Sequence, residues 1–224
     1  MIDFTIPGVY IIDDFVPEVF QDYLYKNYSK KAWYFLDGID GETSYRNKEL
    51  QNFQIDPNNP ILDNIEEQFQ FVWESFHLAR NIFREEDINP LFFFHYLQLH
   101  TNFQYNFNPQ RCKINLQTNA PHFKKTSHNA PHTDLGDSMP NHWTMIYYVN
   151  DSDGDTLIFN ETPKYRPVKN FTINKKISPK RGRAIIFPGD RFHCGTTPII
   201  SKARIVANLN FLVNPSVPWE SPKI

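Results

Sequence analysis

From residue 91 onward the chain is divided into short apolar segments separated by turn residues, and this pattern limits its fold more than any other feature. We expect strands at 91–100, 111–117, 143–150, 155–160, 168–174, 183–188, 193–198 and 203–213. The Asp-Ser-Asp-Gly sequence at 151–154 is expected to form a hairpin turn, and 179–182 another turn. Many short strands at this spacing favour an antiparallel sandwich or a jelly roll with helices packed outside.

The first 90 residues have a mixed pattern that we interpret as mainly helical. Apolar residues from Pro17 to about Trp33 recur at helical spacing, and Pro60 is placed to open a second helix. The apolar face of that second helix would consist of Leu62, Ile65, Phe69, Val72, Trp73 and Phe76. We therefore predict a single domain over 1–224, with a mainly helical part (1–90), a β core (91–213) and a Pro-rich C-terminal arm (214–224).

Composition excludes several classes of function. Lys and Arg number 23 against 25 Asp and Glu, so no basic field for nucleic acid is present. No apolar run is long enough for a membrane helix, and the first residues lack the pattern of a signal peptide. Two cysteines, Cys112 and Cys194, are too few for a disulfide scaffold. We expect a cytoplasmic protein with neither a nucleic-acid nor a membrane partner.

A His-x-Asp pair, His132 and Asp134, is the first candidate for metal binding. With 8 His in the chain, composition alone gives about half of one such pair, so the motif is weak in isolation. Pro121 and Pro131 exclude a helix around it, and residues two apart on a strand point to the same side. Together with His193, which begins a later strand, the pair could form the two-His, one-carboxylate triad that suits Fe(II).

Arg204 begins the last predicted strand and shares one face with Val206, Asn208 and Asn210. A cation inside a β core is costly unless an anion meets it, so Arg204 could bind an acidic co-substrate.

Two other interpretations remain open. The histidines could be ordinary core or surface residues, with Arg204 paired to a carboxylate of the protein. A local group (His122, His128, His132 and His142) could bind a metal of its own, although its spacing fits no compact zinc site.

Several segments, in this order, resemble the 2-oxoglutarate and Fe(II)-dependent dioxygenases, specifically the prolyl 4-hydroxylase-like branch. They are APHTD, IYYVND with SDGDTLIF, ISPKRGRAIIFPGDRFHCGTTP and ARIVANLNF, and more weakly the N-terminal VYIIDDFVPEVFQDYL. The resemblance implies a mostly β fold with flanking helices around a double-stranded β-helix, the jelly-roll or cupin-like core. The second Arg that nucleic-acid demethylases of this superfamily carry shortly after the first is absent, which argues against base repair.

The resemblance also implies roles for particular residues. His132, Asp134 and His193 would be the iron ligands and catalytic centre, and Arg204 and Tyr148 would bind the C5 carboxylate of 2-oxoglutarate. Asn208 and Asn115 are further candidates for co-substrate contacts, with Gln117 on the same strand face as Asn115. The implied cofactors are Fe2+, 2-oxoglutarate as co-substrate and O2, and the resemblance also allows ascorbate.

The implied reaction is hydroxylation of a C–H bond, coupled to decarboxylation of 2-oxoglutarate to succinate and CO2. The substrate is left unassigned: a peptide or protein, for example at proline, or a small molecule, because specificity lies in loops. We expect 118–131 to act as a lid and 34–52 as a second wall of the pocket. The alternative is a non-catalytic jelly-roll (cupin-like) binding or structural domain.

Overall fold

The computed structural model describes residues 2–36, 69–84, 87, 89–135, 139, 141–163 and 171–215, and its main feature is two antiparallel sheets. The larger sheet has eight strands in the order β1-β9-β6-β11-β5-β3-β2, with β4 paired to β3. Its strands are β1 (Tyr10–Ile12), β2 (Tyr34–Leu36), β3 (Gln70–His77), β4 (Ile82–Phe83), β5 (Tyr105–Thr118), β6 (Trp143–Tyr148), β9 (Ala184–Pro188) and β11 (Ala203–Pro215). The smaller sheet has the order β10-β7-β8. Its strands are β7 (Thr156–Phe159), β8 (Ile173–Ile177) and β10 (His193–Gly195).

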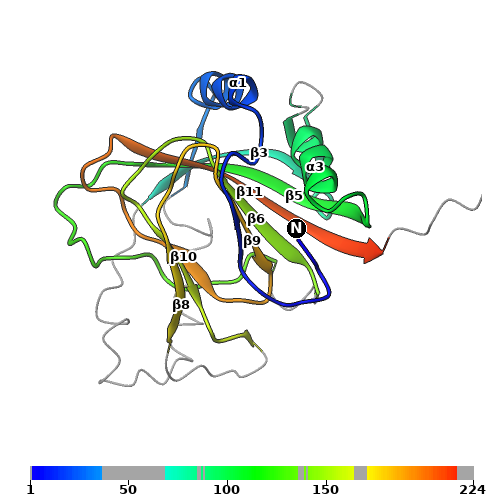
Figure 1. The fold of residues 1–224 in the computed structure, drawn as a ribbon. Helices are drawn as coiled ribbons and strands as arrows, with labels where there is room; N and C mark the ends of the chain where they lie inside the picture. The colour runs from blue at the N-terminus through cyan, green and yellow to red at the C-terminus, as the bar shows by residue number, and fades with distance from the viewer. Residues whose placement is uncertain are drawn as a thin grey trace, which may run out of the picture.

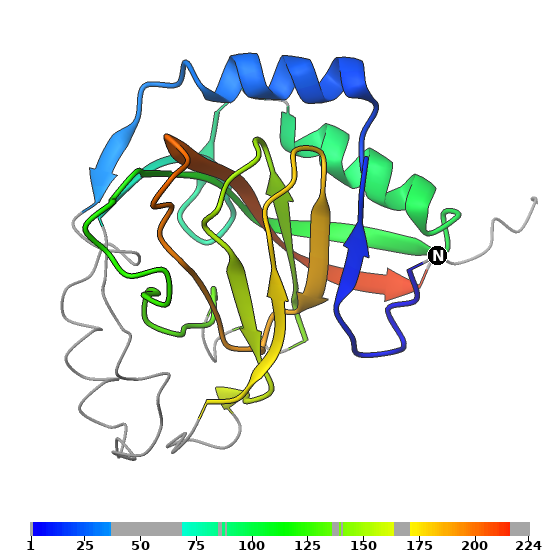
Figure 2. The same ribbon diagram turned by 60° about the vertical axis from the view of Figure 1, so that its left-hand side comes forward.

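Two helices, α1 (Glu18–Tyr28) and α3 (Asn89–His100), cover one face of the larger sheet, and the smaller sheet lies on its other face (Figures 1 and 2). The helix expected from Pro17 is confirmed, although it ends at Tyr28. Among the described residues, no helix has the length and apolar composition that crossing a membrane requires.

Some local predictions are wrong. The segment 91–100, expected as a strand, lies within the helix α3, and 70–77, expected within the second helix, is the strand β3. The described part of 1–90 also contains β1, β2 and β4, so "mainly helical" does not fit it. The 151–154 turn does not close a hairpin, because β6 and β7 belong to different sheets. Parts of three predictions lie outside the described residues: 37–52 of the pocket wall predicted at 34–52, 60–68 of the second helix, and 216–224 of the C-terminal arm.

In the middle of the larger sheet, β6 is buried on both faces, and its alternate residues pack in opposite directions. On β6, Met145 and Tyr147 join the core under the helices, whereas Ile146 and Tyr148 join a second core with Ile158 of the smaller sheet. Burial on both faces explains why β6 is apolar along its length instead of alternating with polar residues. The prediction of a mostly β fold with flanking helices is confirmed.

The inner face of the larger sheet, between the two sheets, also carries polar residues. On β11 the residues of one face (Ile205, Ala207, Leu209 and Phe211) lie in the core under the helices. The opposite face points inward and carries Arg204, Val206, Asn208 and Asn210. The register with β5 places Gln117 beside Arg204, Lys113 beside Asn208 and Arg111 beside Asn210. We call the inward polar residues of β5 and β11 the polar stripe: Arg111, Lys113, Asn115, Gln117, Arg204, Asn208 and Asn210.

Candidate active site

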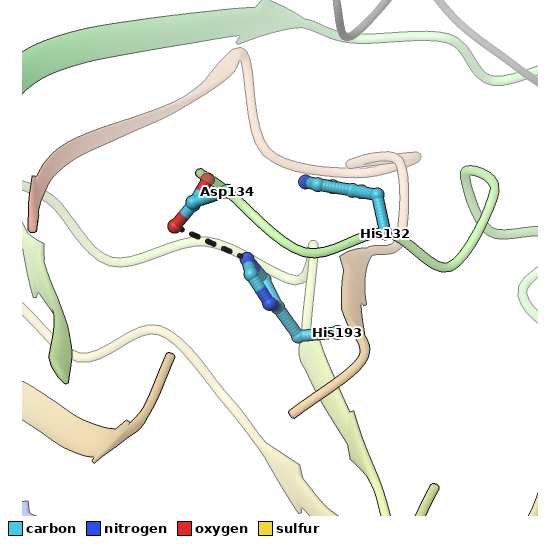
Figure 3. Close-up of side chains that lie close together, drawn as sticks. All are labelled: His132, Asp134 and His193. Carbon is cyan, nitrogen blue, oxygen red and sulfur yellow. Dashed lines mark ion pairs between the residues drawn. The ribbon is translucent and has the colours of Figure 1, made fainter. Parts of the chain in front are cut away.

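His132 and His193 are held directly opposite each other by a short antiparallel bridge. Each backbone N–H donates to the other residue's carbonyl, over 3.0 Å from His132 and 2.9 Å from His193. The two imidazole rings lie on the same side of this bridge with their centroids 4.7 Å apart (Figure 3). His193 is also paired with Ile158 on β7, which turns its side chain into the space between the sheets.

Both histidines present Nε2 to this space. His132 Nδ1 lies 3.0 Å from the carbonyl oxygen of Ala130, and His193 Nδ1 lies 3.2 Å from that of Arg191. A carbonyl can only accept, so each Nδ1 carries the proton and each Nε2 keeps a lone pair for a metal. Burial lowers the pKa of His193 to about 4, so this ring is neutral at neutral pH.

The Asp134 carboxylate completes the group and is surrounded by hydrogen-bond donors. Its side chain is 5% exposed, and Oδ2 lies 3.6 Å from His193 Nε2 (Figure 3). Arg111 Nη2 is 2.7 Å from Oδ1, and the amides of Asn208 and Asn210 donate over 3.1 and 3.0 Å. Burial alone would raise the pKa of Asp134, but the charge of Arg111 and these contacts hold it well below its usual range. The carboxylate is therefore ionised and available as a ligand.

Ligand atoms of His132, Asp134 and His193 all lie within 4.8 Å of one another. Two imidazole nitrogens and one carboxylate oxygen are a donor set that suits Fe(II), so these residues fit the iron that the sequence pattern implies. Among the described residues this is the group of His, Cys, Asp and Glu side chains that could hold an ion, and it does not include His122, His128 or His142.

Arg204 is a buried cation on the polar stripe. It is 6% exposed, and its Nε and Nη2 donate to the Gly154 carbonyl (2.8 Å) and to Thr156 Oγ1 (2.9 Å). Within the described part of the chain it forms no ion pair with a carboxylate, and burial lowers the pKa of its guanidinium although the charge of Asp155 acts in the opposite direction. A buried arginine with spare N–H groups fits the carboxylate of a co-substrate.

Tyr148 lies beside this cation. Its ring is 5.9 Å from the Arg204 guanidinium carbon, and its hydroxyl is 2.7 Å from the hydroxyl of Thr156. Burial raises the pKa of Tyr148 to about 12, so the phenol keeps its proton and can donate it in a hydrogen bond. The predicted contact of Tyr148 with 2-oxoglutarate stays a prediction.

The two asparagines that were co-substrate candidates occupy different places. Asn208 contacts Asp134 through its amide nitrogen, whereas Asn115 lies on β5 beside Val206. The buried Oδ1 atoms of both have no hydrogen-bond partner among the described residues. Sequence reasoning missed Arg111, Thr156 and Asn210 as parts of the site. Period-two alternation along β5 from Asn115 and Gln117 could have pointed to Arg111.

Gly154 provides the room that Arg204 occupies, which leads to a prediction. A Cβ added at Gly154 would lie 2.9 Å from Arg204 Cδ and 2.8 Å from the Thr196 carbonyl oxygen, so Gly154→Ala must displace one of them. We expect the 2-oxoglutarate KM to rise about tenfold, because a small misplacement of a binding group is costly. Steady-state kinetics measures it. Gly8→Ala is the control, since its nearest contact would be 4.0 Å away; equal KM values in both variants would contradict the prediction.

Comparison with known proteins finds a family model that matches the part of the chain holding these residues. Residues 118–212 match the family model of the 2OG-Fe(II) oxygenase superfamily, a range that contains His132, Asp134, His193 and Arg204. No curated protein matches the chain.

Solved structures share the fold at low sequence identity. One is a prolyl hydroxylase from Trichoplax adhaerens, solved with a hypoxia inducible factor peptide fragment, at 12% identity and TM-score 0.52, covering 93% of this chain and 84% of that one. Another is the α-ketoglutarate-dependent carbocyclase SnoK from nogalamycin biosynthesis, at 9% identity and TM-score 0.57, covering 93% and 82%. These likenesses confirm the predicted jelly-roll fold.

Proposed function

We propose that this chain, of which residues 118–212 match the 2OG-Fe(II) oxygenase superfamily, is a member of that superfamily and hydroxylates a C–H bond at the site of His132, Asp134 and His193. The observation that carries the proposal is the convergence of three ligand atoms within 4.8 Å in the space between the sheets. The buried cation of Arg204 supports it, because a dicarboxylate co-substrate would supply the missing negative charge.

Each residue has a separate task in this proposal. When bound, Fe(II) and 2-oxoglutarate supply the activation of O2, with succinate and CO2 as products. His132 and His193 offer Nε2 lone pairs, and Asp134 offers one ionised oxygen. Arg204 binds the C5 carboxylate, and Tyr148 donates a hydrogen bond to it. Apolar side chains near the site, such as Phe187, whose ring centroid is 5.1 Å from that of His193, keep water out of it.

For the substrate, we propose either a peptide or protein, with proline as the first residue to test, or a small molecule. The Trichoplax adhaerens enzyme with a bound peptide supports the first choice and the carbocyclase the second, both through the fold alone. The segment 118–131 as a lid, a cytoplasmic location, and the absence of nucleic-acid and membrane partners stay predictions. The competing function is a non-catalytic jelly-roll domain that binds a ligand without turnover.

Conversion of 2-oxoglutarate to succinate separates the two functions. We expect the purified protein with Fe(II), ascorbate and O2 to form succinate from 2-oxoglutarate. Removal of Fe(II) by a chelator should lower the rate at least about 100-fold, since the metal supplies the reaction's activation. Succinate is measured by NMR. Iron binding without any succinate would favour the non-catalytic domain, and binding of neither iron nor 2-oxoglutarate would exclude the proposed function.

A further inference from the structure

Arg111 is a partly buried arginine that contacts a candidate metal ligand and that the proposed reaction does not use. Resting on the proposed function, we propose that Arg111 is a positioning residue, which makes Asp134 bind the metal through one oxygen and so keeps a coordination position open for the co-substrate. This role goes beyond the ligand set, because Arg111 itself would touch neither metal nor co-substrate.

Arg111 holds Asp134 in two ways. Directly, Nη2 lies 2.7 Å from Oδ1, and Nη1 lies 3.4 Å from the Asp134 carbonyl oxygen. Indirectly, Nε donates over 2.9 Å to Asn210 Oδ1, and the Asn210 amide donates over 3.0 Å to Asp134 Oδ2. Asn210 is the register partner of Arg111 on β11, so the sheet itself fixes this arrangement. The arginine side chain is 12% exposed, and the carboxylate 5%, so water screens the pair only weakly.

The two carboxylate oxygens are not equivalent. The Asn208 amide donates to both oxygens over 3.1 Å, but Oδ1 alone has the short, charge-assisted contact with Arg111. Oδ2 faces His193 Nε2 at 3.6 Å and otherwise accepts bonds from neutral groups, Asn210 and Thr144. Binding a metal through Oδ2 leaves the Arg111 contact intact. Binding through both oxygens would require turning Oδ1 toward the ion and breaking the strongest contact of the group.

The number of carboxylate oxygens on the metal decides how many positions remain. Three protein ligand atoms leave three of six positions, which suits a chelating co-substrate that takes two and O2 that takes one. A carboxylate bound through both oxygens would occupy one of these positions. Arg111 therefore acts on co-substrate binding through Asp134, and without the metal it has no such effect.

The variant Arg111→Gln tests this role in the Mn(II)-loaded protein. We expect one fewer water on the ion, measured as reduced broadening of the Mn(II) EPR signal in 17O-enriched water. We also expect the Kd of 2-oxoglutarate, measured by calorimetry, to rise about tenfold. The affinity for the metal does not decide the question, because two effects of the substitution oppose each other. Loss of the arginine charge strengthens the attraction of Asp134 for the ion, whereas loss of the contact lets the carboxylate rotate, which weakens metal binding.

Three companion variants make the result decisive. Arg111→Lys keeps the charge and should restore most of the wild-type broadening. Asn210→Ala removes the indirect contact, together with the bond of Asn210 to Thr144, but keeps the direct contact of Arg111 with Asp134, so it should give a smaller change in the same direction. This variant also serves if Arg111→Gln does not fold. Arg183→Gln breaks an arginine–carboxylate pair with Asp13 away from the site (2.6 Å) and should change nothing.

The outcomes distinguish this inference from the proposed function. If Arg111→Gln shows the wild-type Mn(II) broadening and the wild-type Kd for 2-oxoglutarate, the positioning role is overturned while the proposed function stands. If only Asn210→Ala folds, the same result in that variant overturns the role. Failure of the wild-type protein to bind Mn(II) and 2-oxoglutarate would instead remove the proposed function on which the inference rests.

Discussion

Alanine in place of His193 is expected to abolish iron-dependent succinate formation while the fold stays intact. His193 supplies one of the three converging ligand atoms, and the other histidine of the group, His132, is itself a ligand, so no further described histidine of the group can replace it. Loss of one metal ligand should reduce kcat/KM for 2-oxoglutarate by about 10³-fold or more, equivalent to about 4 kcal/mol of activation free energy. The measurement is the rate of succinate formation at saturating Fe(II), with circular dichroism to check the fold.

His128→Ala is the matched control for that variant. Both histidines are 3% exposed, and His128 also lies near the site, bridged to Thr196, so the two substitutions remove similar buried volume. His128→Ala should retain turnover within about threefold once the protein is folded, because His128 is not one of the three converging ligand residues. Full turnover in His193→Ala, or its loss only in His128→Ala, would show that the ligands are assigned wrongly.

Replacing Arg204 with methionine should raise the KM for 2-oxoglutarate about 100-fold, with a smaller change in kcat. Removing one partner of a buried, hydrogen-bonded charge pair costs about 2–5 kcal/mol, and each 1.4 kcal/mol is about a factor of ten. The effect should fall on KM because Arg204 would hold the end of the co-substrate that does not react. Steady-state kinetics over a range of 2-oxoglutarate concentrations measures both constants.

Two variants test whether the KM depends on both the charge of Arg204 and the two parallel hydrogen bonds that its guanidinium can form. Arg204→Lys keeps the charge without the bidentate geometry, so its KM should lie between those of wild type and Arg204→Met. Arg183→Met removes an arginine outside the site, which pairs with Asp13, and should leave KM unchanged. An unchanged KM in Arg204→Met would mean that the buried cation serves the structure and not the co-substrate.

The fold class followed from the sequence, whereas the assignment of some helices and strands did not. The strand pattern after residue 100 predicted the two sheets because period-two alternation and turns are local signals. In residues 91–100, apolar side chains are spread around the whole helix, so the segment shows no helical periodicity. Its many Phe residues favour a strand prediction instead. In 70–77 the spacing of Val72, Trp73 and Phe76 mimics a helix, because β3 is packed on both of its faces and carries a bulge near Glu74.

The candidate site shows the same division between local and long-range information. His132, Asp134 and His193 could be predicted from the family resemblance, and the structure brings them together. The expected strand under the His-x-Asp pair is wrong, because His132 lies on an isolated bridge and Asp134 on a bend. Alternation along β5 could place Arg111 on the inward face, but its position beside Asp134 depends on the register between β5 and β11, which pairs it with Asn210. The contact of Thr156 with Arg204 likewise joins the smaller sheet to the larger one, and no sequence pattern specifies how two sheets face each other.

The central claim is that His132, Asp134 and His193 hold the iron and Arg204 holds the co-substrate. A crystal structure of the protein with Fe(II) and 2-oxoglutarate, grown without oxygen, tests this claim most directly. We predict one ion bonded to Nε2 of His132, Nε2 of His193 and one oxygen of Asp134, with the C5 carboxylate of 2-oxoglutarate on Arg204. An ion held by His122, His128 or His142 instead, or a 2-oxoglutarate molecule that does not reach Arg204, would contradict the proposed site.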